Sequence, residues 1–249
     1  MKKKILKVIA PIVTFIILFA LWEIICTVKE VPKWFVPKPS AIFTSMVVDF
    51  AEIWPHLLAT FECVFIGFII AIPVGLLVAT LITSFPTLNA AMSPYITFLV
   101  TTPLVCLIPL LMLTMGFGMN MRITVVVIQA FAVINMNACT GFNNVPLIRR
   151  ELMQSVGASP FKTYTMMILP SAATDIITGL RLAAIFATTT CISVEYNAGN
   201  TGLGSLIIKY SQYMKVAQSF ACIFYVTIIG LIMYGLIAFL QKKIVSWKE

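Results

Sequence analysis

The sequence predicts an all-α integral membrane protein with about six transmembrane helices and a helical loop between the fourth and the fifth. Of the 249 residues, 60% are hydrophobic and only 10% are charged, and the mean hydropathy of +1.02 lies outside the range of soluble domains. Apolar runs long enough to cross a bilayer recur along the chain. One polar and amphipathic stretch, residues 149–170, interrupts them.

Each predicted span is an apolar run of the length that a bilayer core requires, roughly 20 residues of helix. The runs lie at about 9–28, 57–83, 92–113, 122–142, 175–196 and 218–240. The first is longer than the apolar core of a cleavable signal peptide, and no small-residue cleavage site follows Trp22 and Glu23, so we expect it to be retained. Because no repeat or linker divides the chain, residues 1–249 are expected to form a single transmembrane domain.

The distribution of Lys and Arg predicts the orientation in the membrane. An even number of spans puts both termini on one side, and the positive-inside rule assigns the cation-rich side to the cytoplasm. That side carries Lys2, Lys3, Lys4, Lys7, Arg149, Arg150, Lys162, Lys242, Lys243 and Lys248. The other side carries Lys29, Lys33, Lys38, Lys209 and Lys215, with Arg122 at a boundary. We therefore expect a multi-pass protein of the cytoplasmic (inner) membrane with both termini in the cytoplasm.

The loop at about 143–172 predicts two short helices joined by a bend. Asn144 is expected to cap the first helix, with Pro146 in its opening turn. Apolar residues at three- and four-residue spacings gather on one side of this helix: Leu147, Ile148, Leu152, Met153 and Val156. Gly157 is expected to end it, Ser159-Pro160 to begin the second helix, and Pro170 to interrupt the helix just before the fifth span.

Periodicity leaves two uses open for an amphipathic helix in this place. It could lie in the lipid headgroups, anchored by Arg149, Arg150 and Lys162. It could instead fit a groove on a cytoplasmic partner. The net charge of +8 does not favour a nucleic-acid partner, because the cations cluster beside apolar runs and form no basic face with interleaved aromatic residues.

The spacing Glu151-x5-Gly157-x9-Met167-x-Leu169-Pro170 resembles the EAA signature of ABC importer permeases. This chain has Leu152 and Met153 where that family usually has two alanines, and Met167 for isoleucine. Further stretches resemble successive blocks of the branch that serves sulfonates, taurine, nitrate and thiamine-pyrimidine or riboflavin-type substrates. They are LWEIICTVKEVPKWFVPKPSAIFTSM, GFIIAIPVGLLVATL, TTPLVCLIPLLMLTMGFG, ILPSAATDIITGLRLA and EYNAGNTGLGSLI, and together they cover most of residues 21–206.

The resemblance implies a type I ABC importer permease fold and a role as the transmembrane subunit of an ATP-driven importer. Its partners would be a second permease copy, usually identical, two cytoplasmic ATPase subunits, an extracytoplasmic solute-binding protein and membrane lipid. ATP and Mg²⁺ would belong to the ATPase subunits, and this chain would bind no cofactor. The loop would be the coupling helix that docks on the ATPase, through Arg150, Glu151, Leu152, Met153, Val156, Gly157, Ala158, Phe161, Leu169 and Pro170.

The sequence agrees with this division of labour, because it contains no G-x4-G-K-[ST] phosphate loop with which to bind ATP. Enzymatic chemistry is not indicated, since His56 is the only histidine and lacks partners for a triad or a metal site. The six cysteines, one in each predicted span, have no metal-ligand spacing and are expected to be small buried hydrophobic residues.

Polar residues inside spans are candidates for the translocation path, because lipid does not satisfy their hydrogen bonds. The candidates are Glu62, Thr101, Thr102, Gln129, Asn135, Asn137 and Thr188, and hydrogen bonding between helices is the alternative reading for each. Asn135 and Asn137 are favoured because two amides lie close together in the sequence. Pro73, Pro94, Pro103 and Pro109 are expected to mark kinks or breaks in the spans.

Two charged residues of the fifth span are expected to have structural roles. Arg181 is expected to snorkel or to contact another helix, and Glu195 to be satisfied by water or by a loop at the outer end. They are about 21 Å apart along a helix, so they do not pair.

An ATP-independent secondary carrier or channel is the alternative function. It would predict an inverted repeat or a dense intramembrane ion relay, and the sequence shows neither. Few cations lie within the spans, which favours an organic solute such as a thiamine precursor, riboflavin, a sulfonate or taurine over nitrate.

Overall fold

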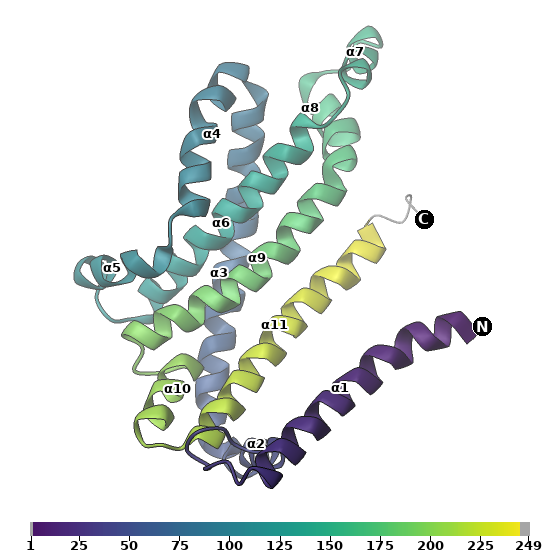
Figure 1. Cartoon of the computed structure of the whole chain (residues 1–249). Coiled ribbons are helices and arrows are strands. Elements are labelled where there is room, and N and C mark those ends of the chain that lie inside the picture. Colours follow the sequence, from purple (N-terminus) through teal and green to yellow (C-terminus); the bar gives the residue numbers. More distant parts are fainter. Residues whose placement is uncertain (1, 245–249) are drawn as a thin grey trace.

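The chain folds into a bundle of long helices with short helices at its ends (Figure 1). The computed structural model describes the backbone of residues 2–244 and the side chains of residues 9–243. Five helical segments in this range are long and apolar enough to span a bilayer. They are α1 (Lys2–Val28), α3 (Phe50–Ser84), α6 (Met119–Asn143), the segment Pro160–Ala198 that contains α9 (Leu169–Ala198), and α11 (Val216–Ile244).

The third expected span, 92–113, is not one straight helix. It divides into α4 (Pro86–Thr101), the 3-10 turn η1 (Leu104–Leu107) and α5 (Ile108–Met115), and the two halves meet at 83°. The break lies at Thr102, whose φ of −69° and ψ of 124° are extended. Proline disfavours helical dihedral angles in the residue before it, so Pro103 places the break. The expectation of six spans therefore holds only if this bent pair is counted as one.

The core consists of α3, α6 and α9, which pack side by side. Glycines permit the close approach of α6 to both neighbours. A Cβ on Gly75 of α3 would lie 2.9 Å from Ile134 Cγ2 of α6, and a Cβ on Gly179 of α9 would lie 2.5 Å from Asn137 Cβ of α6. Small residues at such crossings are a common way to pack helices in membranes, where burial of apolar surface gives little driving force.

The helices at the two ends of the sequence lie outside this core. The fifth long helix, α11, packs on α9, whereas α1 diverges from α11 and is held chiefly at its carboxyl-terminal end (Figure 1). There Glu23 accepts hydrogen bonds from the Ser40 backbone N–H and hydroxyl, at 3.0 and 2.8 Å. Ser40 belongs to α2 (Pro39–Val48), so this contact fixes the turn between α1 and α2.

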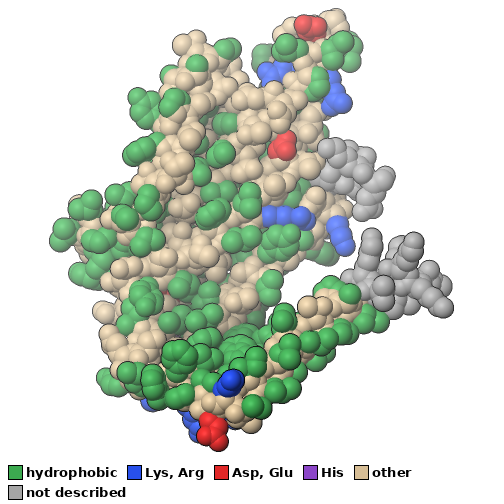
Figure 2. All heavy atoms as spheres, viewed as in Figure 1, with side chains coloured by type: hydrophobic (Ala, Val, Ile, Leu, Met, Phe, Trp, Pro, Cys, Tyr) green, Lys and Arg blue, Asp and Glu red, His purple; other side chains and the backbone are tan. Residues whose placement is uncertain are grey.

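Short helices cap the two ends of the bundle (Figure 1). One end carries α2 and α10 (Leu203–Gln212), and we call it the α10 end. The opposite end carries α7 (Leu147–Ser155) and α8 (Pro160–Thr163), and we call it the α7 end. Figure 2 shows hydrophobic side chains spread along the long helices, and charged side chains near α7 and also at the opposite end, near the turn between α1 and α2. A surface that faces lipid between two aqueous layers is expected to be apolar along its length.

Candidate functional site

The helix α7 projects from the bundle as its tip (Figure 1), and none of its residues is buried. Five apolar side chains here are 64% to 75% exposed, three from α7, one from its C-cap and one from α8: Leu147, Ile148, Leu152, Val156 and Phe161. Glu151 is exposed among them. No part of the described chain covers this surface, which we call the α7 tip.

The start of α7 differs from the sequence expectation. Asn144 does not cap it, because its φ of −74° and ψ of −5° are helical and its backbone N–H donates to the Thr140 carbonyl, which makes it the C-cap of the preceding helix α6. The N-cap is Pro146, without any side-chain hydrogen bond. Only Asn144, Val145 and Pro146 therefore separate the core helix α6 from α7.

The bend after α7 lies at Gly157, as predicted. Its φ is +69°, a left-handed conformation that costs L-residues with a Cβ roughly 1–2 kcal/mol. The Gly157 N–H donates to Gln154 and the Ala158 N–H to Met153, which is the hydrogen-bond pattern of a Schellman motif. The restart is also confirmed, because the Ser159 hydroxyl accepts from the Lys162 N–H at 3.4 Å and Pro160 opens α8.

Pro170 does not interrupt the helix, contrary to the sequence expectation. A π-helical turn, η2 (Tyr164–Ile168), joins α8 directly to α9, and Pro170 lies in the first turn of α9. The ring of an internal proline would clash with the carbonyl four residues earlier in a regular helix, and the wider π turn removes that clash. Residues Pro160–Ala198 thus form one helical segment of 39 residues from the α7 bend to the α10 end.

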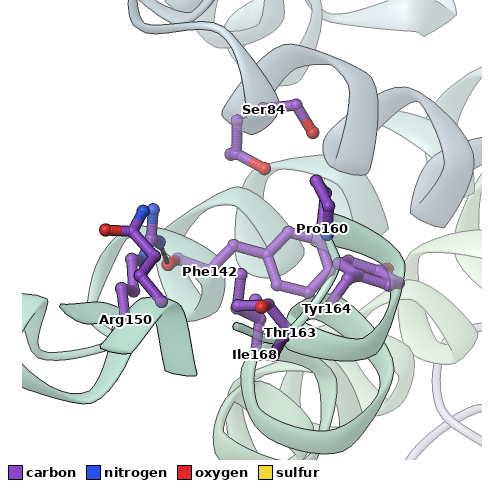
Figure 3. Close-up of a pocket in the computed structure, with 10 residues that line it drawn as sticks. Ser84, Phe142, Arg150, Pro160, Thr163, Tyr164 and Ile168 are labelled. Carbon is purple, nitrogen blue, oxygen red and sulfur yellow. Dashed lines mark hydrogen bonds between the residues drawn. The ribbon is translucent and has the colours of Figure 1, made fainter. Parts of the chain in front are cut away.

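Two arginines attach α7 to the bundle. Arg150 Nη2 donates to the Phe142 carbonyl of α6 at 2.7 Å, and Arg149 Nη1 donates to Ser171 Oγ of α9 at 3.3 Å. Arg150 also lines a cavity of about 330 Å³ between α7 and the core (Figure 3). On the floor of this cavity the Phe142 ring contacts Tyr164 edge to face at 5.7 Å. Arg150 therefore points back to α6 and not toward a partner.

The remaining predicted coupling residues divide by exposure. Exposed at or beside the α7 tip are Glu151, Leu152, Val156, Gly157 and Phe161. Partly covered are Arg150, Met153, Ala158, Leu169 and Pro170. Leu169 and Pro170 belong to the helical segment Pro160–Ala198, which begins after the Gly157 bend and continues into the core. They therefore do not form part of the exposed surface.

A polar cavity of about 230 Å³ lies between α3, α4 and α6, on the α7 half of the bundle. It is lined by Ile82, Asn89, Ser93, Ile96, Thr97, Asn135, Met136, Cys139, Thr140 and Asn143, and we call it the Asn135 cavity. Asn135 is fully buried, and its Nδ2 donates to the Gly75 carbonyl of α3 at 3.2 Å. None of the lining residues carries a charge.

Of the seven predicted path residues, only Asn135 lines this cavity. Asn137 instead packs on Gly179 of α9 and donates to its own helix at Val133, because two residues along a helix turn the side chain by about 200°. The two amides therefore face different neighbours. Thr188 lies in an apolar cavity between α9 and α11. The other four predicted path residues do not line the Asn135 cavity either. Gln129 is buried in α6, Thr102 lies at the break after α4, and Thr101 and Glu62 are exposed.

The sequence reasoning missed the other polar residues of the Asn135 cavity, although their spacing was visible. Asn89, Ser93 and Thr97 recur every four residues on α4, and Asn135, Cys139 and Asn143 recur every four residues on α6. Residues at this spacing share one face of a helix. Two polar stripes of equal length in neighbouring apolar segments were the signal that could have identified the cavity.

A buried carboxylate organises the α10 end. Glu195 of α9 is fully buried and accepts from the Thr60 hydroxyl of α3 at 2.9 Å and from the Gly204 N–H at 3.0 Å. Arg122 of α6 lies 3.4 Å from the same carboxylate and also donates to the Thr201 carbonyl at 2.9 Å. The sequence expectation was water or a loop, whereas the partners of Glu195 come from α3, α6 and the first turn of α10. Through Arg122 and Thr201, this Glu195 cluster also ties the three core helices to the loop before α10.

Two features of the Glu195 cluster escaped the sequence reasoning. Arg122 was placed at a boundary and His56 was given no role, whereas His56 Nδ1 lies 3.1 Å from the backbone nitrogen of Gly202. Gly202 has a φ of +109°, and a Cβ there would collide with the Glu195 carboxylate. Arg181 does not pair with Glu195, as expected. Its guanidinium lies 5.3 Å from the Tyr234 ring centre on α11, which is a contact between helices.

Residues 71–246 match the model of the family described as binding-protein-dependent transport system inner membrane component. The chain belongs to this family. The match contains the core helices α6 and α9 and the whole α7 tip.

Relatives of this permease extend over nearly its whole length. It is 25% identical to the taurine transport system permease protein TauC of Escherichia coli, over 94% of this chain and 88% of that protein. It is also 25% identical to the formylaminopyrimidine transport permease protein ThiX of Halalkalibacterium halodurans, over 99% of each chain. Other matched permeases are named for riboflavin, nitrate or bicarbonate transport.

A solved structure confirms the fold of the permease. An amino acid ABC transporter with histidines superposes with a TM-score of 0.64 at 19% identity, over 81% of this chain and 98% of that one. This is the type I ABC importer permease fold expected from the sequence.

Proposed function

We propose that this permease is the transmembrane subunit of an ATP-driven importer and that the α7 tip is its coupling helix. One observation carries the proposal. The α7 tip presents uncovered apolar side chains around an exposed Glu151, and it is fixed to the core by Arg150 on one side and by the helical segment 160–198 on the other.

The direction of the arginines favours a protein partner over a lipid surface. An interfacial helix would direct its cations at anionic headgroups. Here Arg149 and Arg150 donate to Ser171 and to the Phe142 carbonyl, within the permease itself. The exposed Glu151 would be repelled by anionic lipid but can orient the helix in a groove through a charge contact with an ATPase subunit.

The proposed orientation places the α7 end in the cytoplasm. The helix α11 runs toward that end and carries Lys242 and Lys243 in its last turn (Figure 1). With Arg149, Arg150 and Lys162, these cations satisfy the positive-inside rule, and both termini are then cytoplasmic. The α10 end would face the extracytoplasmic solute-binding protein.

The remaining partners follow the organisation of such importers. A second copy of the permease would complete the path, and two ATPase subunits would hold the ATP and Mg²⁺. Closure of the ATPase pair would displace α7 as a rigid body and move the core helices with it. We propose a small organic solute, such as a thiamine precursor, riboflavin, a sulfonate or taurine, ahead of nitrate.

A pull-down of the tagged permease from membranes in mild detergent tests the coupling assignment. Mass spectrometry should identify an ATPase with the wild-type protein, and Glu151→Lys should reduce its recovery at least about tenfold, which corresponds to about 1.4 kcal/mol. Glu30→Lys makes the same charge change at an exposed position near α2 and should leave recovery unchanged. Equal recovery with both variants, or no ATPase with the wild type, would refute the coupling role and return the carrier alternative to consideration.

A further inference from the structure

The Asn135 cavity collects more polar groups than helix packing requires. The hydroxyls on its wall bond within their own helices: Ser93 donates to Asn89, Thr97 to Ser93 and Thr140 to Met136. Between the two facing helices, α4 and α6, the hydrogen bond from Asn89 Nδ2 to Asn143 Oδ1 at 3.3 Å is the one that joins them in the described residues. The oxygen of each of these hydroxyls can still accept hydrogen bonds after it donates.

The depth of the cavity explains why this arrangement needs water or a solute. Asn135 lies eight residues before the end of α6, which corresponds to about 12 Å along the helix from the α7 end. At such depth lipid offers no acceptor for the second N–H of the Asn135 amide, and no donor to the wall hydroxyl oxygens beyond the bonds within their own helices. Unmet hydrogen-bonding capacity is costly in hydrocarbon. Polar groups that line a space at this depth are satisfied when the space holds water or a polar ligand.

The lining also restricts what the cavity can hold. It contains amides, hydroxyls and one thiol, but no Lys, Arg, His, Asp or Glu. An ion that leaves water for such a site loses its hydration and gains no opposite charge, which is strongly unfavourable. An uncharged solute with several hydrogen-bonding groups meets donors and acceptors on α4 and α6 and pays no such cost.

We infer that the Asn135 cavity is a solute-contact site on the α7 half of the translocation path and that it favours uncharged, hydrogen-bonding organic solutes over inorganic anions. This inference rests on the proposed importer function and narrows its substrate class. Asn135 holds the wall of the site through Gly75, and the stripe of Asn89, Ser93 and Thr97 forms the opposite wall.

Cys139 provides a native reporter, because its thiol lies in the cavity wall and is partly accessible. Full-length permease in membrane vesicles is treated with two water-soluble methanethiosulfonates, one with an uncharged hydroxyethyl group and one with a sulfonate, and peptide mass spectrometry locates the label. Cys139 should react with the hydroxyethyl reagent and about tenfold more slowly with the sulfonate, relative to their rates on a free thiol. Thr227→Cys, in the apolar cavity between α9 and α11, is the matched control and should stay unlabelled.

Thr140→Lys tests the role of charge, since it adds a cation to the exposed rim of the cavity. It should raise the relative rate of the sulfonate reagent at Cys139 about tenfold, because unit charges several ångströms apart in a partly solvated site attract by a few kcal/mol. In vesicles that contain the whole importer, wild-type uptake should be faster for riboflavin or formylaminopyrimidine than for nitrate or bicarbonate, and Thr140→Lys should reduce that ratio.

Three results would overturn the inference: an unreactive Cys139, equal relative rates for the two reagents in the wild-type protein, or faster wild-type uptake of nitrate or bicarbonate. The labelling does not depend on an ATPase, so it separates the two proposals. Cys139 labelling without ATPase recovery would refute the coupling role alone, whereas ATPase recovery with an unreactive Cys139 would refute the solute site alone.

Discussion

Removal of the Glu195 carboxylate should destabilise the permease more than any change of an exposed charge. In Glu195→Ala, the Arg122 guanidinium loses its counter-ion and the Gly204 N–H loses its acceptor, while both remain buried in the wall of the cluster. Breaking a buried ion pair on one side typically costs about 3–5 kcal/mol. Because Arg122 keeps the Thr201 carbonyl as a partner, we expect the lower end of this range, about 3 kcal/mol.

A double-mutant cycle isolates the ion pair from the loss of packing. Stability is measured as the free energy of unfolding in mixed micelles for the wild type, Glu195→Ala, Arg122→Leu and the double variant. The double variant should recover about 1–3 kcal/mol relative to the sum of the single changes, because it leaves no unpaired charge. Glu62→Ala, at an exposed position of α3, serves as the control and should change stability by less than about 0.5 kcal/mol.

Equal free energies of unfolding for Glu195→Ala and Glu62→Ala would refute a stabilising role of the buried carboxylate. A double variant whose loss of stability equals the sum of the two single losses would refute a stabilising ion pair. Either result would mean that water enters the cluster and solvates the charges as well as the protein does.

Three further changes test the α7 end and the core packing. Gly157→Ala should lower the free energy of unfolding by about 1 kcal/mol and lower solute-coupled ATPase activity, because φ is +69° there. Gly118→Ala is its control and should change neither quantity, because an added Cβ there meets open space. Gly179→Ala should lower the free energy of unfolding by about 1–3 kcal/mol, because the added Cβ collides with Asn137. Gly235→Ala on α11 is its control, because an added Cβ there has no neighbour within 4 Å. Tyr164→Phe removes the 2.7 Å hydrogen bond to Thr80 and should cost about 1 kcal/mol in the same unfolding assay; no loss would mean that water replaces Thr80.

Features set by local chemistry could be predicted from the sequence. The bend at Gly157 and the restart at Ser159-Pro160 depend on residues within one turn of each other, and both were located correctly. The prolines gave mixed results for a physical reason. Pro103 disfavours helical dihedral angles at the residue before it, Thr102, so it breaks the third span. At Pro170, a preceding π turn lets the helix continue. A sequence shows the missing N–H of a proline but not whether the turn before it can widen.

Contacts between distant segments could not be predicted in this way. Glu195 and Asn135 were recognised as polar residues inside predicted spans, but their partners Thr60, Arg122 and Gly75 lie on other helices. Which helix faces each side chain depends on the crossing of α3, α6 and α9, and a single sequence does not contain that crossing directly. Asn137 is an example, because its proximity in sequence grouped it with Asn135 although the two side chains face different neighbours.

The continuous helical segment Pro160–Ala198 can tilt as one rigid body about a point near its middle. A close contact with α6, at Gly179 against Asn137, lies near its middle, so each end is about 25–30 Å from this contact at 1.5 Å per residue. A tilt of about 5° around this point would move the α7 bend and the Glu195 cluster by roughly 2 Å each, in opposite directions. A small displacement of the α7 tip at one membrane surface would thus produce a displacement in the opposite direction at the other surface. Neither the length nor the hydrogen bonds of the helix would change.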